Sequence, residues 1–208
     1  MLGAVADLLL PRYCAGCGEP AEWWSVLCMR CRRELARPPQ RVFPKVAVPA
    51  PVFALGPYAG AHRGVILAMK ERNNLAVRAH VGAILDAALT HLEARGDIAA
   101  AEALVPAPTR RANARARGGD PVRAVCEASG RATSPVLSLA RATADQAALD
   151  QAGRRANLEG AVRVHGVPAG SVVVVDDVVT TGATLEASVA VLLARGVDVA
   201  GCVTLAEA

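Results

Sequence analysis

One apolar run along the chain ends in an abrupt change to polar residues. Residues 172–175 are four consecutive valines, which indicates a strand buried on both faces, as in a parallel sheet covered by helices. Asp176 and Asp177 follow directly, and we expect the strand to end there. After a short loop, apolar residues recur at helical spacing from Leu185 onward, which predicts a helix opening at about residues 181–184. The predicted order is strand, acidic pair, hydroxyl-rich loop and helix start.

The rest of the chain alternates between short apolar stretches and helical patterns. Further strands are predicted at residues 52–58, 103–108, 136–139, 161–164 and 197–205. Helices are predicted at residues 62–72, 75–95 and 121–129. Alternating strands and helices favour an α/β fold with a parallel sheet flanked by helices. Residues 2–10 have an apolar helical face that we expect to dock on the chain, and residues 141–160 form a polar connection typical of a lid.

The composition is that of a folded protein that suits anionic ligands. Of the 208 residues, 53% are hydrophobic and 20% are charged, which excludes an intrinsically disordered chain. The net charge of +4 favours anions but does not by itself imply nucleic acid. No apolar run approaches the roughly 18 residues of a membrane span, and the short apolar start lacks the basic region of a signal peptide. We therefore expect a cytoplasmic protein.

Four cysteines near the start of the chain have metal-binding spacing. Cys14 and Cys17 form one C-x-x-C pair, and Cys28 and Cys31 form a second pair ten residues later. Two such pairs favour a structural zinc site with four thiolate ligands, formed where two hairpin tips converge. Two disulfides or a redox pair are the alternatives. Disulfides fit an intracellular protein poorly, and a redox motif would not need the second pair.

Prolines separate the cysteine-containing part from the larger part of the chain. Residues 38–51 are rich in proline, which predicts a linker with extended, stiff geometry. We therefore divide the chain into a helix and zinc ribbon at residues 1–37, a linker at 38–51 and an α/β domain at 52–208.

The loop after the acidic pair has the chemistry of a sugar-phosphate site. It consists of Thr180, Thr181, Gly182, Ala183 and Thr184. Backbone N–H groups at a helix start attract phosphate, the small residues leave room for its approach, and the threonines add hydroxyl donors. The loop lacks the lysine of a Walker sequence. The adjacent carboxylates suit the hydroxyls of a ribose, so a ribose 5-phosphate unit would span both parts. The alternative is a buried strand followed by a capped helix, with a merely solvated acidic pair.

A second segment with phosphate-binding chemistry follows the strand at residues 103–108. It begins with Arg110 and Arg111 and is dense in arginine as far as Gly118 and Gly119. Guanidinium groups bind phosphate oxygens through paired hydrogen bonds. A pyrophosphate bound there would face the ribose. A solvated basic loop is the alternative.

Residues 172–184 resemble the phosphoribosyl-pyrophosphate (PRPP) signature of type I phosphoribosyltransferases. The resemblance implies that Asp176 and Asp177 act as catalytic residues that hold the ribose 2′- and 3′-hydroxyls, while residues 180–184 wrap the 5′-phosphate. It also implies a type I phosphoribosyltransferase fold for residues 52–208, with Mg²⁺ accompanying PRPP. By the same resemblance, Thr180 stands where 6-oxopurine salvage enzymes have an acid that engages the base, which disfavours hypoxanthine and guanine as acceptors.

The whole order resembles the ComF family, in which a four-cysteine zinc ribbon is fused to a phosphoribosyltransferase-like domain. The supporting segments are residues 9–14, 27–31, 58–60, 68–70, 105–108 with Arg110 and Arg111, 146–149 and 155–161. The resemblance adds Lys70 to the substrate-binding residues and implies a role in DNA uptake during natural transformation, beside a DNA-translocating ATPase. Residues 117–121 read Arg-Gly-Gly-Asp-Pro where the family often has Arg-Gly-Phe-Asn-Gln, so an aromatic and an amide are missing from this segment.

Two functional hypotheses follow. In the first, the protein is a phosphoribosyltransferase with an unknown acceptor, which contributes positioning and electrostatics while Mg²⁺–pyrophosphate leaves PRPP. In the second, the same pocket senses a phosphoribosyl ligand or nucleotide end without turnover, and the ribbon and arginine surface contact single-stranded DNA or the ATPase. Aromatic residues make up only 3% of the chain, with Trp23 and Trp24 as the obvious stacking platforms, which disfavours a strong stand-alone DNA binder. We favour a PRPP-binding domain that serves DNA uptake.

Overall fold

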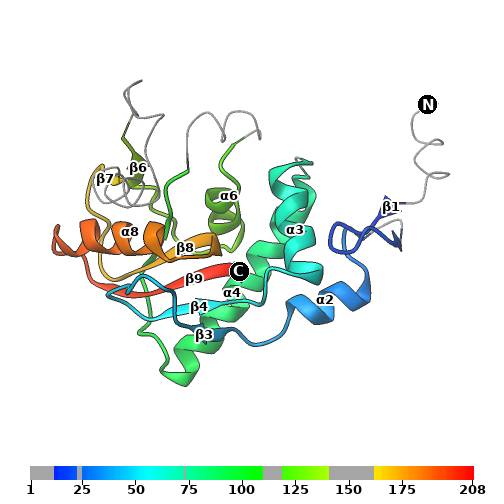
Figure 1. The fold of residues 1–208 in the computed structure, drawn as a ribbon, viewed down its shortest axis with the longest axis horizontal. Helices are drawn as coiled ribbons and strands as arrows, with labels where there is room; N and C mark the ends of the chain where they lie inside the picture. The colour runs from blue at the N-terminus through cyan, green and yellow to red at the C-terminus, as the bar shows by residue number, and fades with distance from the viewer. Residues whose placement is uncertain (1–11, 23–24, 73, 110–118, 141–161) are drawn as a thin grey trace.

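The computed structural model describes residues 12–22, 25–72, 74–109, 119–140 and 162–208 (Figure 1). The strands are β1 (Arg12–Tyr13), β2 (Pro20–Ala21), β3 (Gln40–Val42), β4 (Val52–Ala54), β5 (Ala103–Pro106), β6 (Leu137–Leu139), β7 (Val162–Val164), β8 (Val172–Val179) and β9 (Val199–Glu207). The helices are α2 (Met29–Leu35), α3 (Gly60–Lys70), α4 (Ala76–Arg95), α6 (Pro121–Ala128) and α8 (Ala183–Leu193).

A five-stranded sheet in the order β3-β4-β9-β8-β5 forms the centre of the fold. Strands β4, β9, β8 and β5 are parallel, and β3 pairs antiparallel with β4 at one edge. Val174 of β8 pairs with Val105 of β5 on one side and with Cys202 of β9 on the other. Because parallel strands end at the same edge of a sheet, the residues that follow β5 and β8 meet at one edge, where open α/β sheets bind their ligands.

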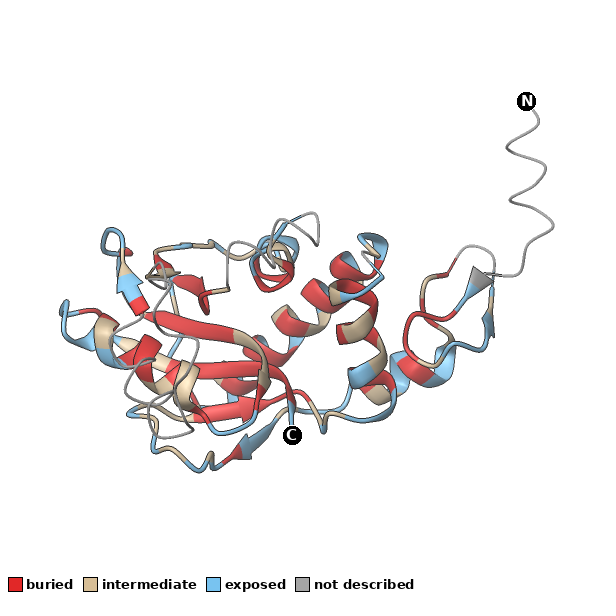
Figure 2. Ribbon diagram, turned by 45° about the horizontal axis from the view of Figure 1, so that its top comes forward, coloured by how far each residue is buried: buried red, intermediate tan, exposed pale blue. Residues whose placement is uncertain are grey.

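Helices cover both faces of this sheet, so β8 is buried on each side. Val173 and Val175 belong to an apolar cluster with residues of α3, α4 and α6. Val172 and Val174 belong to a second cluster with residues of α8 and of the antiparallel pair β6–β7. All four valines are fully buried, and the central strands lie in the innermost layer of Figure 2. The predicted α/β fold and the doubly buried valine strand are confirmed.

The predicted helices are also confirmed. The patterns over residues 62–72, 75–95 and 121–129 correspond to α3, α4 and α6, and the helix after the acidic pair, α8, begins at Ala183. Helix α4 stops at Gly96, whose φ of 71° is a left-handed conformation that glycine adopts without the steric cost of a side chain.

Several strand boundaries differ from the prediction: β5 ends at Pro106 rather than at residue 108, and β9 spans Val199–Glu207 rather than residues 197–205. The expected end of the valine strand at the acidic pair is wrong, because β8 continues to Val179, which pairs with Glu207 of β9. The strand expected over residues 52–58 is shorter, since β4 ends at Ala54. Strand β3, which the sequence pattern did not predict, lies within residues 38–51. The continuation of β8 follows from its pairing with β9, and β3 forms by pairing with the nearby strand β4.

Several expectations concern residues outside the described ranges. These are the helix at residues 2–10, Trp23, Trp24, Arg110, Arg111 and the lid at residues 141–160. Among the described helices, none combines the length and the apolar character that a membrane crossing requires.

Candidate functional site

The acidic pair lies near the carboxyl end of β8, where the sheet emerges from between its helical layers. Asp177 forms an ion pair with Lys70, the last residue of α3, with 2.5 Å between the ammonium nitrogen and the carboxylate oxygen Oδ2. Neighbouring residues of a strand point to opposite faces, so Asp177 lies on the α3 side and Asp176 on the other. Asp176 accepts a hydrogen bond of 2.8 Å through Oδ1 from the backbone N–H of Asp177. Both carboxylates therefore flank the same strand end.

The side-chain carboxyl group of Asp176 has a strongly raised pKa. Removal from water raises the pKa of its carboxyl to about 7, and the charge of Asp177 acts in the same direction. The Asp177 N–H and the Lys70 ammonium oppose this shift without cancelling it. The charge of Asp176 in turn contributes, after burial, to raising the pKa of Cys202 on β9 to about 12. Near neutral pH, Asp176 can thus exchange a proton, which few carboxyl groups do.

The loop from Thr180 to Thr184 turns directly from β8 into α8. Thr180 and Thr181 are exposed, and Gly182 is the N-cap residue with a φ of 89°. The backbone N–H of Ala183 donates to Oγ1 of Thr181 at 3.3 Å. The five residues therefore form a continuous turn at a helix start, where backbone N–H groups and hydroxyls can receive a phosphate.

Residues 44–46 contact the loop at residues 180–184. The N–H of Val46 donates to the carbonyl oxygen of Thr181 at 2.8 Å. A Cβ atom on Gly182 would lie 2.5 Å from Cβ of Pro44, which is closer than packed side chains allow. Glycine is thus required at residue 182 both for its left-handed backbone and for this close approach.

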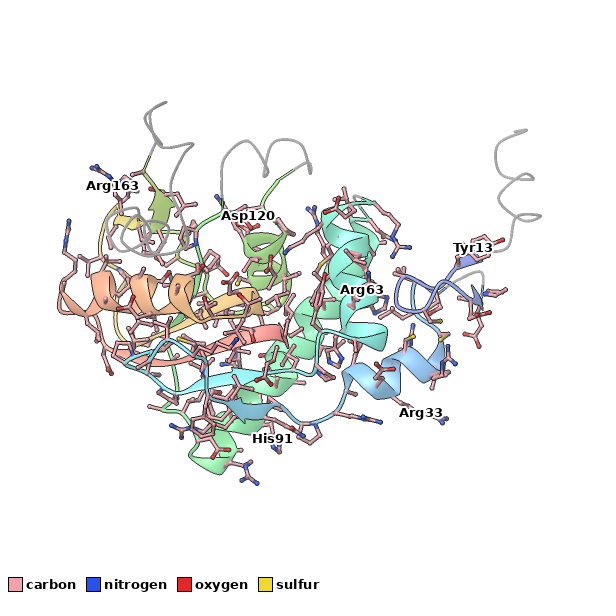
Figure 3. The ribbon with its side chains drawn as sticks, viewed as in Figure 1. Tyr13, Arg33, Arg63, His91, Asp120 and Arg163 are labelled. Atoms are coloured by element: carbon pink, nitrogen blue, oxygen red, sulfur yellow. The ribbon has the colours of Figure 1, made fainter. Side chains whose placement is uncertain are left out.

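The start of α6 lies near the same edge of the sheet. Asp120, labelled in Figure 3, caps α6 by accepting hydrogen bonds from the N–H groups of Val122 at 2.9 Å and Arg123 at 3.3 Å. Its charge is one of the smaller contributions that raise the pKa of Asp176. Arg110 and Arg111 belong to the connection between β5 and α6 but lie outside the described residues.

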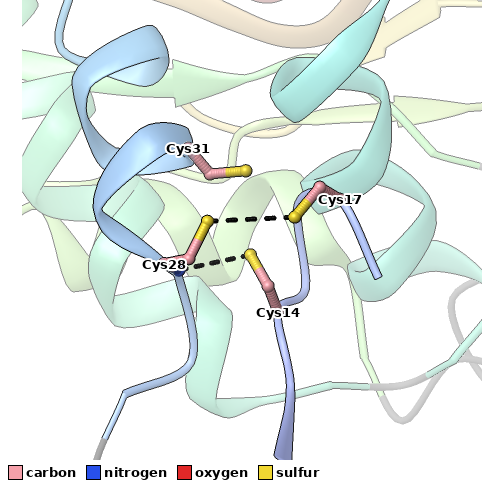
Figure 4. Close-up of side chains that lie close together, drawn as sticks. All are labelled: Cys14, Cys17, Cys28 and Cys31. Atoms are coloured by element: carbon pink, nitrogen blue, oxygen red, sulfur yellow. Dashed lines mark hydrogen bonds between the residues drawn. The ribbon is translucent and has the colours of Figure 1, made fainter. Parts of the chain in front are cut away.

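The four cysteines form one cluster in the N-terminal part of the chain. The sulfur atoms of Cys14, Cys17, Cys28 and Cys31 all lie within 4.8 Å of one another and point toward a common centre (Figure 4). The sulfur atoms of Cys17 and Cys28 are 3.8 Å apart. A zinc–sulfur bond of about 2.3 Å in a tetrahedron gives a sulfur–sulfur edge of about 3.8 Å. The donor set thus fits a zinc ion.

The two cysteine pairs are presented by different structures. Cys14 and Cys17 lie between the antiparallel strands β1 and β2, as expected for a hairpin tip. The expectation of a second hairpin tip is wrong, because Cys28 is the N-cap of α2 and Cys31 lies in its first turn. Burial acts to raise the pKa of Cys14, but the N–H groups of Cys28 and Cys17 outweigh it and lower this pKa to about 6. A lowered pKa favours the thiolate that a metal ligand must present, whereas burial and the neighbouring thiols raise the pKa of Cys31.

Helix α3 connects the cysteine cluster to the acidic pair. A Cβ atom on Gly64 of α3 would overlap the carbonyl oxygen of Gly16, and one on Gly16 would lie 2.8 Å from the sulfur of Cys31. Glu34 of α2 accepts a hydrogen bond of 2.8 Å from the N–H of Ala61, in the first turn of α3. The other end of α3 carries Lys70. Neither Glu34 nor the segment at residues 44–46 was predicted to support the site, because neither lies within a motif.

Comparison with known proteins agrees with this geometry. Residues 137–208 match the family model of the phosphoribosyl transferase domain, a stretch that contains β6, β7, β8, α8 and β9. A search of curated proteins found no match. The fold and this match define an α/β protein with a mostly parallel sheet and a phosphoribosyltransferase-type domain, to which a four-cysteine cluster is joined.

Replacing a cysteine of the cluster should release the metal and destabilise the protein. A structural zinc ion supplies folding free energy, so Cys28→Ser should lose the one zinc per chain that four clustered thiols can hold and should unfold at a lower temperature. Elemental analysis and thermal unfolding measure both effects. Cys126→Ala removes a buried thiol of α6 and should retain the zinc. Purified wild-type protein that is metal-free and fully folded would contradict the prediction.

The raised pKa of Asp176 predicts a pH-dependent gain in stability for Asp176→Asn. The folded protein keeps a proton on Asp176 up to about pH 7, whereas the unfolded chain loses it near the ordinary value of 3.8. The wild type therefore loses stability relative to the amide variant as pH rises across this window. Urea unfolding between about pH 5 and about pH 8 should show the difference growing with pH. Asp198→Asn, at an exposed position, serves as the control, and a constant difference for Asp176→Asn would refute the assignment.

Proposed function

We propose that the protein binds PRPP and transfers its phosphoribosyl group to an acceptor. The main support for this proposal is the arrangement of residues where β8 leads into α8. Two carboxylates, a lysine ion pair and a hydroxyl-rich helix start occur together there. The junction lies at the carboxyl edge of the sheet and within the segment that matches the phosphoribosyl transferase domain.

Each residue has a distinct role in this proposal. A ribose across the end of β8 meets the carboxylates of Asp176 and Asp177, which accept hydrogen bonds from its 2′- and 3′-hydroxyls. Residues 180–184 surround the 5′-phosphate with N–H groups and hydroxyls. Lys70 orients the Asp177 side chain before the ligand arrives, through the ion pair of 2.5 Å between its ammonium nitrogen and Oδ2 of Asp177. Arg110 and Arg111 bind the pyrophosphate.

The reaction breaks the bond between C1′ and the pyrophosphate oxygen and forms a bond between C1′ and the acceptor. The electron pair of the broken bond leaves with pyrophosphate, and the acceptor supplies the new pair and releases its proton. Mg²⁺ bound with PRPP would neutralise charge on the leaving group. Asp176 and Asp177 fix the ribose. Asp176 adds negative charge beside a ring that becomes positive in the transition state once its proton is lost above about pH 7.

The finer part of the proposal is that the protein is of the ComF type, acts in the cytoplasm and serves DNA uptake. The sequence resemblance supports it, together with the joining of a four-cysteine cluster to a phosphoribosyltransferase-type domain. A DNA-translocating ATPase and single-stranded DNA are the partners this role requires. In a naturally transformable cell that encodes the protein, its deletion should lower transformation frequency, and the wild-type gene should restore it. Unchanged transformation in the deletion strain would exclude this role.

Removal of both carboxylates should abolish stabilisation by PRPP. The variant Asp176→Asn with Asp177→Asn should remain folded but lose the rise in unfolding temperature that PRPP with Mg²⁺ gives the wild type. A ligand at 100 times its Kd stabilises a folded protein by about 2.7 kcal/mol, which thermal unfolding detects easily. Asp198→Asn should retain the effect. Equal stabilisation of the double variant would remove the ribose assignment.

Binding and turnover are separated by two further measurements on the same preparation. Calorimetry with PRPP and Mg²⁺ measures affinity, and a pyrophosphate-release screen over bases and amines looks for an acceptor. Binding without release across the screen would favour the sensing role over the transferase.

A further inference from the structure

A groove lies on a side of the molecule that the phosphoribosyl site does not use. It has a volume of about 450 Å³ and runs between α4 on one wall and α2 with the segment 36–39 on the other. Leu27 and Leu35 are buried at its base, and Pro38 and Pro39 stiffen one rim. In Figure 1, α2 and the lower part of α4 lie away from the end of β8 that carries the acidic pair.

Helix α4 presents a stripe of small or apolar residues to this groove, with one histidine at each end of the stripe. The stripe consists of His80, Ala83, Ile84, Ala87 and His91. Their spacing of three and four residues places them on one helical face, which differs from the face that buries Leu85 and Leu89 in the core. Ala83 and Ala87 are exposed, so a second helix could approach the backbone of α4 closely there. From His80 to His91 the stripe is about 16 Å long, or three helical turns.

The rim of the groove is basic. Arg32 and Arg37 lie on the α2 side and His80 and His91 on the α4 side, and the described residues that line the groove include no acid. Figure 3 shows His91 at the lower end of α4. Arg32 is fixed by donating from Nε to the Leu27 carbonyl at 3.1 Å and from Nη2 to Oγ of Ser25 at 2.8 Å.

The acidic residues of α4 do not offset this charge. Asp86 and Glu93 each form an ion pair with Arg131, at 2.7 Å and 2.6 Å. Burial lowers the pKa of His80, and the charge of Arg32 lowers it further, which disfavours the charged imidazole beside Arg32. Arg32 and Arg37 therefore carry the fixed positive charge of the rim. An occupant with carboxylates at its edges and aliphatic side chains between them would complement the groove.

We propose that this groove binds an acidic amphipathic helix of a partner protein. About three turns of that helix lie along α4, with leucine-like side chains over Ala83, Ile84 and Ala87 and carboxylates near Arg32 and Arg37. Nucleic acid is disfavoured because the described lining contains no tryptophan, tyrosine or phenylalanine on which bases could stack. The proposal does not depend on PRPP binding.

A display selection tests the groove without assuming the sequence of the partner. A library of helical peptides of about 16 residues is selected on the full-length, zinc-loaded protein, with counter-selection on Ala87→Arg. Enriched peptides should carry leucine-type residues at i, i+3 or i+4 and i+7, flanked by aspartate or glutamate. One labelled peptide is then measured by fluorescence anisotropy. Its affinity should fall at least tenfold in Ala87→Arg and in Arg37→Glu.

Matched variants outside the groove control for charge and helix content. Ala190→Arg is exposed on α8, and Arg33→Glu is exposed on α2 outside the groove lining, and both variants should bind the peptide like the wild type. Should Ala87→Arg fail to fold by circular dichroism, Arg37→Glu at the exposed rim decides the result. No enrichment, enrichment of basic peptides, or equal binding by all variants would overturn the proposal. Competition by a single-stranded thymidine oligonucleotide that is lost in Arg37→Glu would assign the groove to nucleic acid instead.

Discussion

Two neighbouring carboxylates at the end of a buried strand repel each other and lose hydration, and the rest of the site is arranged around that constraint. Strand β8 is covered on both faces, so its valines bring Asp176 and Asp177 to the sheet edge from an interior that water does not enter. One carboxylate is balanced by Lys70 at 2.5 Å, and the other by the N–H of Asp177 together with a proton that it keeps up to about pH 7. A ligand that donates hydroxyl hydrogens to this pair would replace part of the lost hydration.

The ammonium group that balances Asp177 comes from α3. The position of α3 is therefore as important to the site as the carboxylates themselves. One end of α3 is bound by Glu34 and packed against Gly16, while its other end reaches Asp177. The residues Cys14, Ala15, Leu27 and Cys31 share an apolar cluster with Val65 and Ile66 of α3. The cysteine cluster is therefore packed into the same core as the helix that serves the site.

The local sequence pattern was sufficient to predict the valine strand, the helices and the convergence of the four cysteines. The strand and the helices depend on residues close together in the chain. The cysteine cluster depends on two C-x-x-C pairs, whose spacing is typical of a tetrahedral metal site. The ion pair of Lys70 with Asp177 joins residues more than a hundred positions apart, and only the family resemblance drew attention to Lys70. Strand β3 and the continuation of β8 to Val179 depend on partner strands, and the histidine-bounded stripe of α4 forms a groove only because α2 lies opposite. The sequence pattern indicated strands at residues 52–58 and 197–205, but it did not indicate which segments pair or pack with one another.

The contact between Gly16 and Gly64 limits how this architecture can be recombined. A Cβ on Gly64 would overlap the carbonyl oxygen of Gly16, whereas a Cβ on Gly16 would lie 2.8 Å from the sulfur of Cys31. The cysteine loop therefore requires glycine at residue 64, and the cysteine cluster itself requires glycine at residue 16. Grafting a different metal-binding unit onto residues 52–208 would require a loop whose backbone carbonyl can lie against Gly64, and an acid placed like Glu34 to receive the first turn of α3. The two parts of the chain are thus expected to evolve as one unit, with changes on one side matched by changes on the other.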